Sequence, residues 1–281
     1  MQKIKKNAKM KAISSVNNDT IKNIIGLIQK SSTRRKSEVY VVEGKRELQL
    51  AEKSGFRIDK IFCCPEIFKN PKIEEWYTQN LGINTMVRVT ENVYRKISYR
   101  KNTEGIVALV KKKKMDLDSI VFKNKNPLVL VAENIEKPGN IGAMLRTADA
   151  SKIDCLLIAE PQTDIYNPNV IRSSVGGFFS VPIGVGTNEE VHTFLNQHHI
   201  TPHAAGLEAS VSYETIDFTK PSAIVVGAES TGLSKFWLNA CKSNIKIPML
   251  GTLDSMNVSV AAGILLFEAT RQRNFYRDQG I

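Results

Sequence analysis

Three segments in the second half of the chain combine small, polar and charged residues in a way that could hold a ligand and assist a reaction at oxygen. They cover residues 140–147, 227–234 and 247–257, and the last one leads directly into an apolar stretch expected to form a helix over residues 258–274. Amide, guanidinium, carboxylate and hydroxyl groups can orient a reacting hydroxyl or stabilise negative charge that develops on it. The candidates for this chemistry are Asn140, Arg146, Glu229, Ser255 and Asn257.

Glycine patterns in the same half argue against two common nucleotide ligands. Gly227 and Gly232 have the spacing that opens a phosphate-binding loop, but Leu233 stands where the lysine of that loop is needed. Gly184 and Gly186 begin a dinucleotide fingerprint, but Glu189 occupies the position of its third glycine. ATP and a nicotinamide dinucleotide are therefore disfavoured, and with the latter an oxidoreductase function.

The three segments together resemble the three signature motifs of the SpoU/TrmH family. The matching residues are Asn140-Ile141-Gly142 with Arg146 and Thr147, then residues 227–234, then residues 247–262. Members of this family are S-adenosylmethionine-dependent RNA 2′-O-ribose methyltransferases within the larger SPOUT group. The resemblance covers most of residues 127–275, and three motifs in the correct order are far more specific than any one of them. It implies an RNA (ribose-2′-O)-methyltransferase.

The third segment suits S-adenosylmethionine as the cofactor. Residues 253–257 lack positively charged donors that could hold a diphosphate, and nearby cations would repel a sulfonium. Adenine needs only main-chain donors and acceptors with apolar walls. By analogy with the family, the main chain of Gly227, Ile247 and Met256 should cradle the cofactor, with Leu253 beside it. Met256 replaces the leucine usual in the family, which conserves volume.

Methyl transfer to a ribose needs the 2′-oxygen, the methyl group and the sulfur in line, and the hydroxyl must lose its proton. The family assigns activation of this hydroxyl to the arginine that matches Arg146. Because a guanidinium is essentially never deprotonated in proteins, we favour stabilisation of the developing alkoxide, or binding of the adjacent phosphate, over action as a free base. Glu229 could orient Arg146 or Asn140, whereas Ser255 and Asn257 also fit a plain helix N-cap.

The net charge of +11 is unevenly distributed. Residues 1–126 contain 28 Lys/Arg against 13 Asp/Glu, net +15, whereas residues 127–281 contain 11 against 15, net −4. A strongly basic half predicts an acidic partner, and nucleic acid before a membrane. Tyr94 and Tyr99 lie among basic pairs and could stack on splayed bases. The candidate RNA contacts are Arg34, Arg35, Lys45, Arg46, Arg100 and, in a segment that resembles the Arg-Ala-Ser-x-Gly stretch of SpoU proteins, Arg172.

Apolar runs of strand length alternate with helical spacing along most of the chain, which predicts an α/β fold. We expect a basic disordered tail over residues 1–18, a small α/β RNA-binding domain over 19–110, a polar linker over 111–126 and a larger domain over 127–281. The nearly continuous apolar strands of the larger domain are typical of a parallel sheet covered on both faces, with ligand loops at the carboxyl ends of its strands.

The family resemblance adds further expectations. Residues 19–110 are similar to the N-terminal substrate-binding domain of many SpoU enzymes, and the larger domain should contain a trefoil knot and form a homodimer through it. SpoU proteins with this extra domain tend to act on large-subunit rRNA, so 23S rRNA is the expected substrate. The alternatives are a tRNA 2′-O-methyltransferase and a catalytically silent RNA-binding or ribosome-assembly factor. The C-terminal helix offers these residues to the core or to a partner: Val258, Ala261, Ala262, Leu265 and Leu266.

Other ligands and compartments receive no support from the sequence. The four cysteines form no C-x-x-C pair or disulfide framework, which suits the reducing cytoplasm. Pro202 interrupts the helix that would align His199 with His203, so no metal site is predicted. No run of eighteen apolar residues occurs, and no membrane span is expected.

Overall fold

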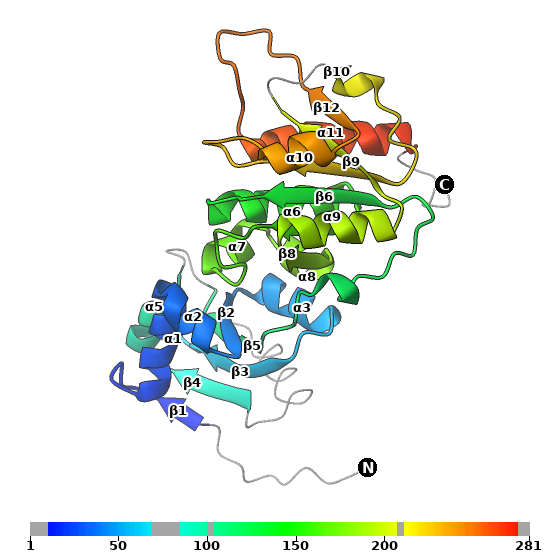
Figure 1. Cartoon of the computed structure of the whole chain (residues 1–281). Helices are drawn as coiled ribbons and strands as arrows, with labels where there is room; N and C mark the ends of the chain where they lie inside the picture. Colours follow the sequence, from blue (N-terminus) through cyan, green and yellow to red (C-terminus); the bar gives the residue numbers. More distant parts are fainter. Residues whose placement is uncertain (1–10, 69–84, 100–103, 207–210, 275–281) are drawn as a thin grey trace. The chain divides into compact units, whose positions relative to one another are not determined.

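The computed structural model describes residues 11–68, 85–99, 104–206 and 211–274. The chain divides into two compact units (Figure 1): unit 1 comprises residues 1–113 and 166–168, and unit 2 comprises residues 114–165 and 169–281. Each unit has its own β-sheet and its own buried core. Among the residues in these four ranges, no helix is both long and apolar enough to cross a membrane.

Unit 1 is built on a five-stranded mixed sheet with the order β1-β4-β3-β5-β2. Strands β1, β4 and β3 are mutually parallel, and β5 is antiparallel to both β3 and β2. Helix α1 buries Ile21, Ile24 and Leu27, whose spacing places them on one helical face, in the core of this unit. The elements are β1 (Lys11–Ile13), α1 (Asp19–Gln29), α2 (Ser31–Lys36), β2 (Val39–Glu43), α3 (Lys45–Lys53), β3 (Ile58–Cys63), β4 (Met86–Val89), α5 (Glu91–Ile97) and β5 (Ile106–Lys111).

Two features of unit 1 differ from the sequence expectations. Part of the expected disordered tail forms strand β1, because Ile13 is buried and the strand pairs with β4. The expected RNA contact Arg34 is only 3% exposed. Its Nη1 donates to the carbonyl oxygens of Leu27 and Ile28 at 2.9 and 3.2 Å. Arg34 therefore stabilises the carboxyl end of α1, and its guanidinium is buried instead of exposed at the surface.

Unit 2 is built on a seven-stranded sheet with the order β10-β12-β9-β11-β6-β7-β8. Every neighbouring pair in this sheet is parallel, as the apolar strands predicted. The elements are β6 (Leu128–Glu133), α6 (Pro138–Ala150), β7 (Cys155–Ala159), α7 (Pro168–Ser173), α8 (Gly177–Ser180), β8 (Ile183–Gly186), α9 (Asn188–Gln197), β9 (Thr201–Ala205), β10 (Val211–Ser212), β11 (Ser222–Val226), α10 (Lys235–Ala240), β12 (Ser243–Lys246) and α11 (Val258–Gln272).

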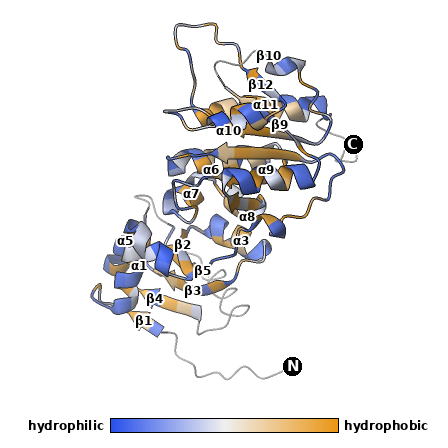
Figure 2. Cartoon of the chain, in the orientation of Figure 1, coloured by the Kyte–Doolittle hydropathy of each residue, from blue (hydrophilic) through white to orange (hydrophobic). Residues whose placement is uncertain are grey.

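Helices cover both faces of the unit 2 sheet. Alternate residues of β6 and β11, such as Val129, Val131 and Val225, pack with Phe194 of α9 and Trp237 of α10 on one face. Helices α6 and α11 pack against each other and against the other face. Because both faces are covered, β6, β7 and β11 are buried along their whole length, and β6 is coloured as hydrophobic over most of it in Figure 2.

The expected linker is partly built into unit 2. Ile120 is buried in the core beneath α9, and Leu117 and Phe122 pack against the same core. The main-chain N–H of Val185 in β8 donates to the carbonyl oxygen of Met115. The apolar residues of this segment are separated by basic and polar ones, so the sequence did not indicate their burial. Residues 115–122 belong to unit 2 and are not a solvated connector.

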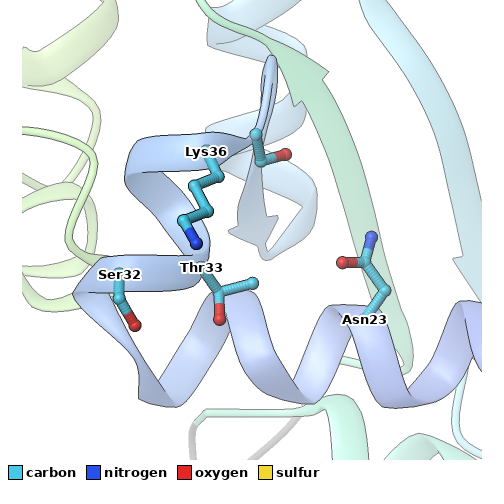
Figure 3. Close-up of a pocket in the computed structure, with 5 residues that line it drawn as sticks. Asn23, Ser32, Thr33 and Lys36 are labelled. Carbon is cyan, nitrogen blue, oxygen red and sulfur yellow. The ribbon is translucent and has the colours of Figure 1, made fainter.

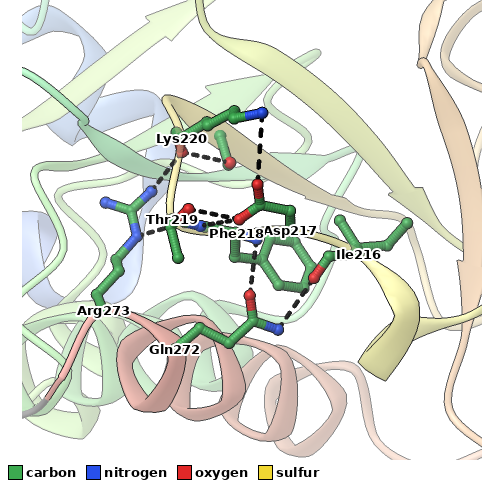
Figure 4. A network of polar contacts seen from close by, with 8 residues as sticks. Ile216, Asp217, Phe218, Thr219, Lys220, Gln272 and Arg273 are labelled. Atoms are coloured by element: carbon green, nitrogen blue, oxygen red, sulfur yellow. Dashed lines mark hydrogen bonds and ion pairs between the residues drawn. The ribbon is translucent and has the colours of Figure 1, made fainter.

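The carboxyl end of α11 is clamped to the start of two strands (Figure 4). Arg273 donates from Nε to the carbonyl oxygen of Phe218 and from Nη2 to that of Lys220, both at 2.7 Å, and it also contacts the carbonyl oxygens of Asn126 and Pro127. Gln272 accepts from the Phe218 N–H at 2.8 Å. These contacts join the last helix to the segments that precede β11 and β6.

A buried histidine gives unit 2 a pH-dependent stability. His203 on β9 is 5% exposed, and its Nδ1 has no hydrogen-bond partner among the described residues. Burial, with a smaller effect from the nearby Lys242, lowers the pKa of His203 to about 4. The unfolded chain therefore binds a proton near pH 6.5 that the folded chain does not bind until about pH 4.

We expect stability to fall as the pH drops from 6.5 to 4 and to be unaffected by this group above 6.5. The shift corresponds to at most about 3 kcal/mol at the acid end. Urea unfolding at pH 7.0 and pH 4.5 measures it, with His203→Leu as the comparison. The variant should lose less stability between the two pH values than the natural chain. Equal losses in both proteins would assign the acid sensitivity to other groups.

Candidate active site

The sheet of unit 2 brings the three predicted segments to one edge. Strands β6, β11 and β12 end at Glu133, Val226 and Lys246, and β11 lies directly beside β6. Because all the strands run in the same direction, the segments that follow these three residues leave the sheet at the same edge. Residues that are distant in the sequence therefore meet there.

Asn140, Glu229 and Asn257, one from each segment, form a single hydrogen-bonded cluster. Nδ2 of Asn140 donates to Oε1 of Glu229. Nδ2 of Asn257 lies 3.3 Å from both Oδ1 of Asn140 and Oε1 of Glu229. The other carboxylate oxygen, Oε2, pairs with Nζ of Lys137 at 2.7 Å. Glu229 thus orients Asn140, one of the two partners that the sequence left open for it.

Two helix starts hold the asparagines in place. Asn140 lies in the first turn of α6, which Pro138 begins, and not in a loop before the helix. Asn257 is the N-cap of α11, where its Oδ1 accepts from the Ser259 N–H at 2.9 Å. Its Nδ2 remains for the cluster. The capping role and the site role therefore use different atoms of the same side chain, and both interpretations of Asn257 apply.

Arg146 and Ser255 do not join this cluster. Arg146 follows Asn140 by six residues on α6, which turns its side chain roughly 240° around the helix axis from Asn140. It is exposed and makes no hydrogen bond or ion pair to any described residue. Ser255 is exposed in the segment before α11 and likewise makes none within the described chain. Both side chains are available to a substrate.

Lys137 was missed by the sequence interpretation. It precedes α6 and is mostly exposed, so its type alone suggested a solvated surface residue. Its hydrogen bond to Glu229, and the attraction between the two charges, raise the pKa of Lys137. The site therefore contains a permanent cation next to its carboxylate.

Gly227 allows the segment that carries Glu229 to close on itself. A Cβ atom at this position would lie 2.4 Å from the carbonyl carbon of Gly232 and 2.5 Å from the main-chain nitrogen of Leu233. Gly232 has a φ of +65°, and its N–H donates to the Ala228 carbonyl oxygen at 2.8 Å. Only glycine fits at Gly227, so this tight closure fixes the main chain on both sides of Glu229.

The segment before α11 has the chemistry that S-adenosylmethionine needs. Residues 248–256 are exposed or half-buried and lie outside helices and strands, so their main-chain groups are open to a ligand. Leu253 is 75% exposed and could cover an adenine ring, while Ile247 and Met256 are half-buried at the two ends. No Lys or Arg occurs between residues 247 and 257 to repel a sulfonium. Together with Gly227, these residues fit the cofactor expected for them.

The other expected RNA contacts differ in their surroundings. Arg35 and Arg46 are exposed in unit 1, Lys45 is half-buried, and Arg172 is exposed in α7. Arg100 lies outside the described residues. The Lys45 N–H donates to Oε2 of Glu104 at 2.7 Å, but its ammonium group is not involved in that contact.

A polar hollow of about 360 Å³ lies between α1 and α2 in unit 1 (Figure 3). It is lined by Asn23, Ser32, Thr33, Lys36 and Ser37. Its amide, hydroxyl and ammonium groups are suited to the phosphate and sugar of a polynucleotide.

No group of three or more His, Cys, Asp or Glu in the described parts of the chain is placed to hold a metal ion.

Two family models match the sequence, one in each half. The model of the SpoU rRNA Methylase family matches residues 127–267, and that of the MRM3-like substrate binding domain matches residues 18–108. A relative from Vibrio parahaemolyticus, the 23S rRNA (guanosine-2′-O-)-methyltransferase RlmB, is 38% identical over 178 residues. That alignment covers 61% of this chain and 72% of the relative.

Solved structures match the chain over most of its length. The crystal structure of an RNA 2′-O ribose methyltransferase has a TM-score of 0.79 and 35% identity, and the match covers 93% of this chain and 99% of that one. The AdoMet-bound rRNA methyltransferase from Sinorhizobium meliloti has a TM-score of 0.84 and 26% identity, with 93% and 97% covered.

Proposed function

We propose that this chain, which belongs to the SpoU rRNA methylase family, methylates the ribose 2′-hydroxyl of a nucleotide in 23S rRNA. The chain is an S-adenosylmethionine-dependent RNA 2′-O-methyltransferase. The observation that carries the assignment of the site is the cluster of Asn140, Glu229 and Asn257, which joins the three family segments at one edge of the sheet. The RlmB relative supports large-subunit rRNA as the substrate class.

Different residues of the site hold the cofactor and orient the side chains around it. S-adenosylmethionine, when bound, supplies an electrophilic methyl group. The main chain of Gly227, Ile247 and Met256 holds it, and the apolar Leu253 side chain covers it. Since Glu229 already accepts from two amides and Lys137, its carboxylate is better suited to orientation than to proton removal.

Arg146 and Ser255 act on the substrate side of the reaction. The exposed guanidinium of Arg146 would stabilise the negative charge that develops on the 2′-oxygen as the proton of that hydroxyl passes to solvent water. Ser255 offers a hydroxyl to the same region.

Mapping of ribose methylation tests the proposal. The purified chain is incubated with S-adenosylmethionine and either 23S rRNA or total tRNA, and protected riboses are located after alkaline hydrolysis. One protected position in 23S rRNA is expected. Methylation of tRNA alone would overturn the substrate, and cofactor binding without methylation of either RNA would favour a silent RNA-binding factor.

We propose that surface cations of unit 1 hold the RNA. Lys36 lines the polar hollow and the exposed Arg35 precedes it in α2, while the half-buried Lys45 and the exposed Arg46 begin α3. The match of residues 18–108 to a substrate binding domain supports this role. Arg172 of α7 is proposed as a further phosphate contact.

The double substitution of Lys45 and Arg46 to Gln should weaken binding of an rRNA fragment roughly tenfold at low salt. Each lost phosphate contact should make the slope of log K against log[salt] shallower by about 0.7–0.9. Titrations at several salt concentrations measure both effects. Lys53→Gln, at the other end of α3, is the matched control and should change neither; an unchanged slope in the double variant would remove α3 from the RNA surface.

We propose that two copies of the chain associate through α11. Val260 and Phe267, seven residues apart on this helix, are 54% and 43% exposed. Five residues of α11 were expected to face the core or a partner. Ala261 is half-buried, and the other four are buried inside unit 2 itself: Val258, Ala262, Leu265 and Leu266. An exposed apolar pair on a long helix suits a symmetric partner.

Light scattering at micromolar concentration should therefore give about twice the 31.3 kDa of one chain. Changing Val260 and Phe267 to Asp should shift the mass to that of one chain, since two buried charges would face each other. A single-chain mass for the natural protein would contradict the dimer.

We also propose that the path from β12 to α11 forms part of a trefoil knot. β12 lies beyond β9, whereas α11 packs on α6, β6 and β11, so residues 247–257 must cross several strand ends. The family supports the threading. The cytoplasm is proposed as the location, because the chain acts on rRNA and its four cysteines are free thiols.

A further inference from the structure

A buried carboxylate lies just behind the active-site edge and has no part in the chemistry proposed above. Glu133, the last residue of β6, is 2% exposed. Oε1 accepts from Nδ2 of Asn188 at 2.9 Å, and Oε2 accepts from the main-chain N–H of Ser234 at 2.8 Å. Removing a carboxylate from water is unfavourable unless hydrogen bonds compensate, so each oxygen of Glu133 depends on its partner.

The partners of Glu133 form a chain with one possible order of donors and acceptors. The fully buried Trp237 donates from Nε1 to Oδ1 of Asn188 at 2.7 Å, and an indole can only donate. Asn188 must therefore turn its carbonyl oxygen to Trp237 and its NH₂ group to Glu133. The Ser234 N–H is also only a donor. A side chain that accepts hydrogen bonds with two separate oxygens is required between Asn188 and Ser234, and the carboxylate of Glu133 is that group.

We infer that Glu133 is a positioning residue for methyl transfer, which acts by holding the segment of residues 227–234. Ser234 follows two residues after Gly232, where the tight closure with Gly227 ends. Its hydrogen bond to Glu133 therefore fixes the carboxyl end of the segment of residues 227–234. The segment carries Glu229 and Gly227, the latter being one of the three main-chain positions assigned to the cofactor. This inference rests on the proposed function, since it names a residue that places the same site.

Glu133→Gln tests the inference with almost no change of shape. The oxygen of the introduced amide can accept from Ser234, but the NH₂ group of that amide then faces the NH₂ group of Asn188. If Asn188 flips, its NH₂ group meets the indole N–H. In either case two donor groups face each other without an acceptor, and the segment should shift. We expect kcat/KM to fall roughly tenfold to a hundredfold, the effect typical of a displaced catalytic group, and the Kd for S-adenosylmethionine to rise.

The double variant Glu133→Gln with Trp237→Phe makes the test specific. Phenylalanine donates no hydrogen bond, so Asn188 can flip and accept from the NH₂ group of the introduced amide. The double variant should therefore recover at least part of the kcat/KM lost in Glu133→Gln, although Trp237→Phe alone leaves a small cavity. Losses that simply multiply would mean that the donor order is not what matters and would overturn the inference. Glu214→Gln, an exposed site in the same unit, is the matched control for the loss of one charge.

Hydrogen exchange of residues 232–234 gives a readout that does not require turnover. These amides should exchange faster in Glu133→Gln and regain protection in the double variant, even if the natural chain methylated no RNA. That result would support the inference while the proposed substrate failed. A lower melting temperature with unchanged exchange and unchanged kcat/KM per folded molecule would make Glu133 a merely stabilising residue.

Discussion

Replacing Arg146 by Ala should lower kcat for RNA methylation by about 10²–10³, the usual effect of removing one group that stabilises a developing oxyanion. The fold should be unaffected, because the side chain is exposed and makes no hydrogen bond or ion pair in the described chain. The Kd for S-adenosylmethionine should also stay unchanged, since the arginine is assigned to the hydroxyl and not to the cofactor. Single-turnover methylation at saturating RNA, with calorimetry for the cofactor, measures both quantities.

Two further variants separate the roles of Arg146. Lys in its place keeps the charge and should retain part of the rate if the group is an electrostatic stabiliser. Lys125→Ala, an exposed cation at the amino end of β6 and thus at the opposite edge of the sheet, should behave as the natural chain. Near-natural turnover of Arg146→Ala at saturating RNA would show that the catalytic assignment is wrong.

The largest effect on stability is expected at Arg273. Its guanidinium donates to the Phe218 and Lys220 carbonyl oxygens at 2.7 Å and reaches the start of β6 as well. This guanidinium is partly removed from water, and its burial lowers the pKa of Arg273. Hydrogen bonds from a charged group contribute about 1.5–3 kcal/mol each and are not additive. Arg273→Ala should therefore destabilise unit 2 by about 3 kcal/mol and lower its Tm by roughly 5–10 °C.

Arg271 is the natural control for this prediction. It lies two residues earlier on α11, is exposed, and pairs with Glu268 of the same helix at 2.8 Å. An exposed pair of this spacing contributes about 0.3–0.5 kcal/mol, so Arg271→Ala should change Tm by no more than about 2 °C. Calorimetric scans of both variants decide the matter. Equal shifts would mean that the carbonyl contacts of Arg273 contribute no more than a surface ion pair.

The sequence predicted the strands of unit 2 and the meeting of its three polar segments because both depend on short-range patterns. An apolar run such as residues 128–131 can only be a buried strand or helix, and its length favoured the strand. Parallel strands then place the residues after them at one edge. The cluster around Glu229 followed from this rule and from the family resemblance, without knowledge of any contact.

The errors came from residues whose role depends on a distant partner. Arg34 belongs to a basic run typical of an RNA contact, yet the end of α1 folds back over it and supplies two carbonyl acceptors. Lys137 has no distinguishing neighbours in the sequence, and its partner Glu229 is 92 positions away, which no local pattern can indicate. Ile13 lies in a mostly polar segment, and its burial follows from the pairing of its strand with β4 and from its packing in the core of unit 1.

The position of β11 has a consequence for how the protein is made. β6 is translated first of the unit 2 strands and pairs with β7 and with β11, whose register joins Leu128 to Ser222. Until β11 leaves the ribosome, one side of a strand that is apolar from Leu128 to Ala132 has no backbone partner, and such an edge pairs readily with other chains. Unit 1, whose described strands end at Lys111, can fold well before then. During synthesis, unit 1 should therefore be folded while unit 2 is still incomplete and prone to aggregate. A chaperone that binds the incomplete unit 2 would prevent this aggregation.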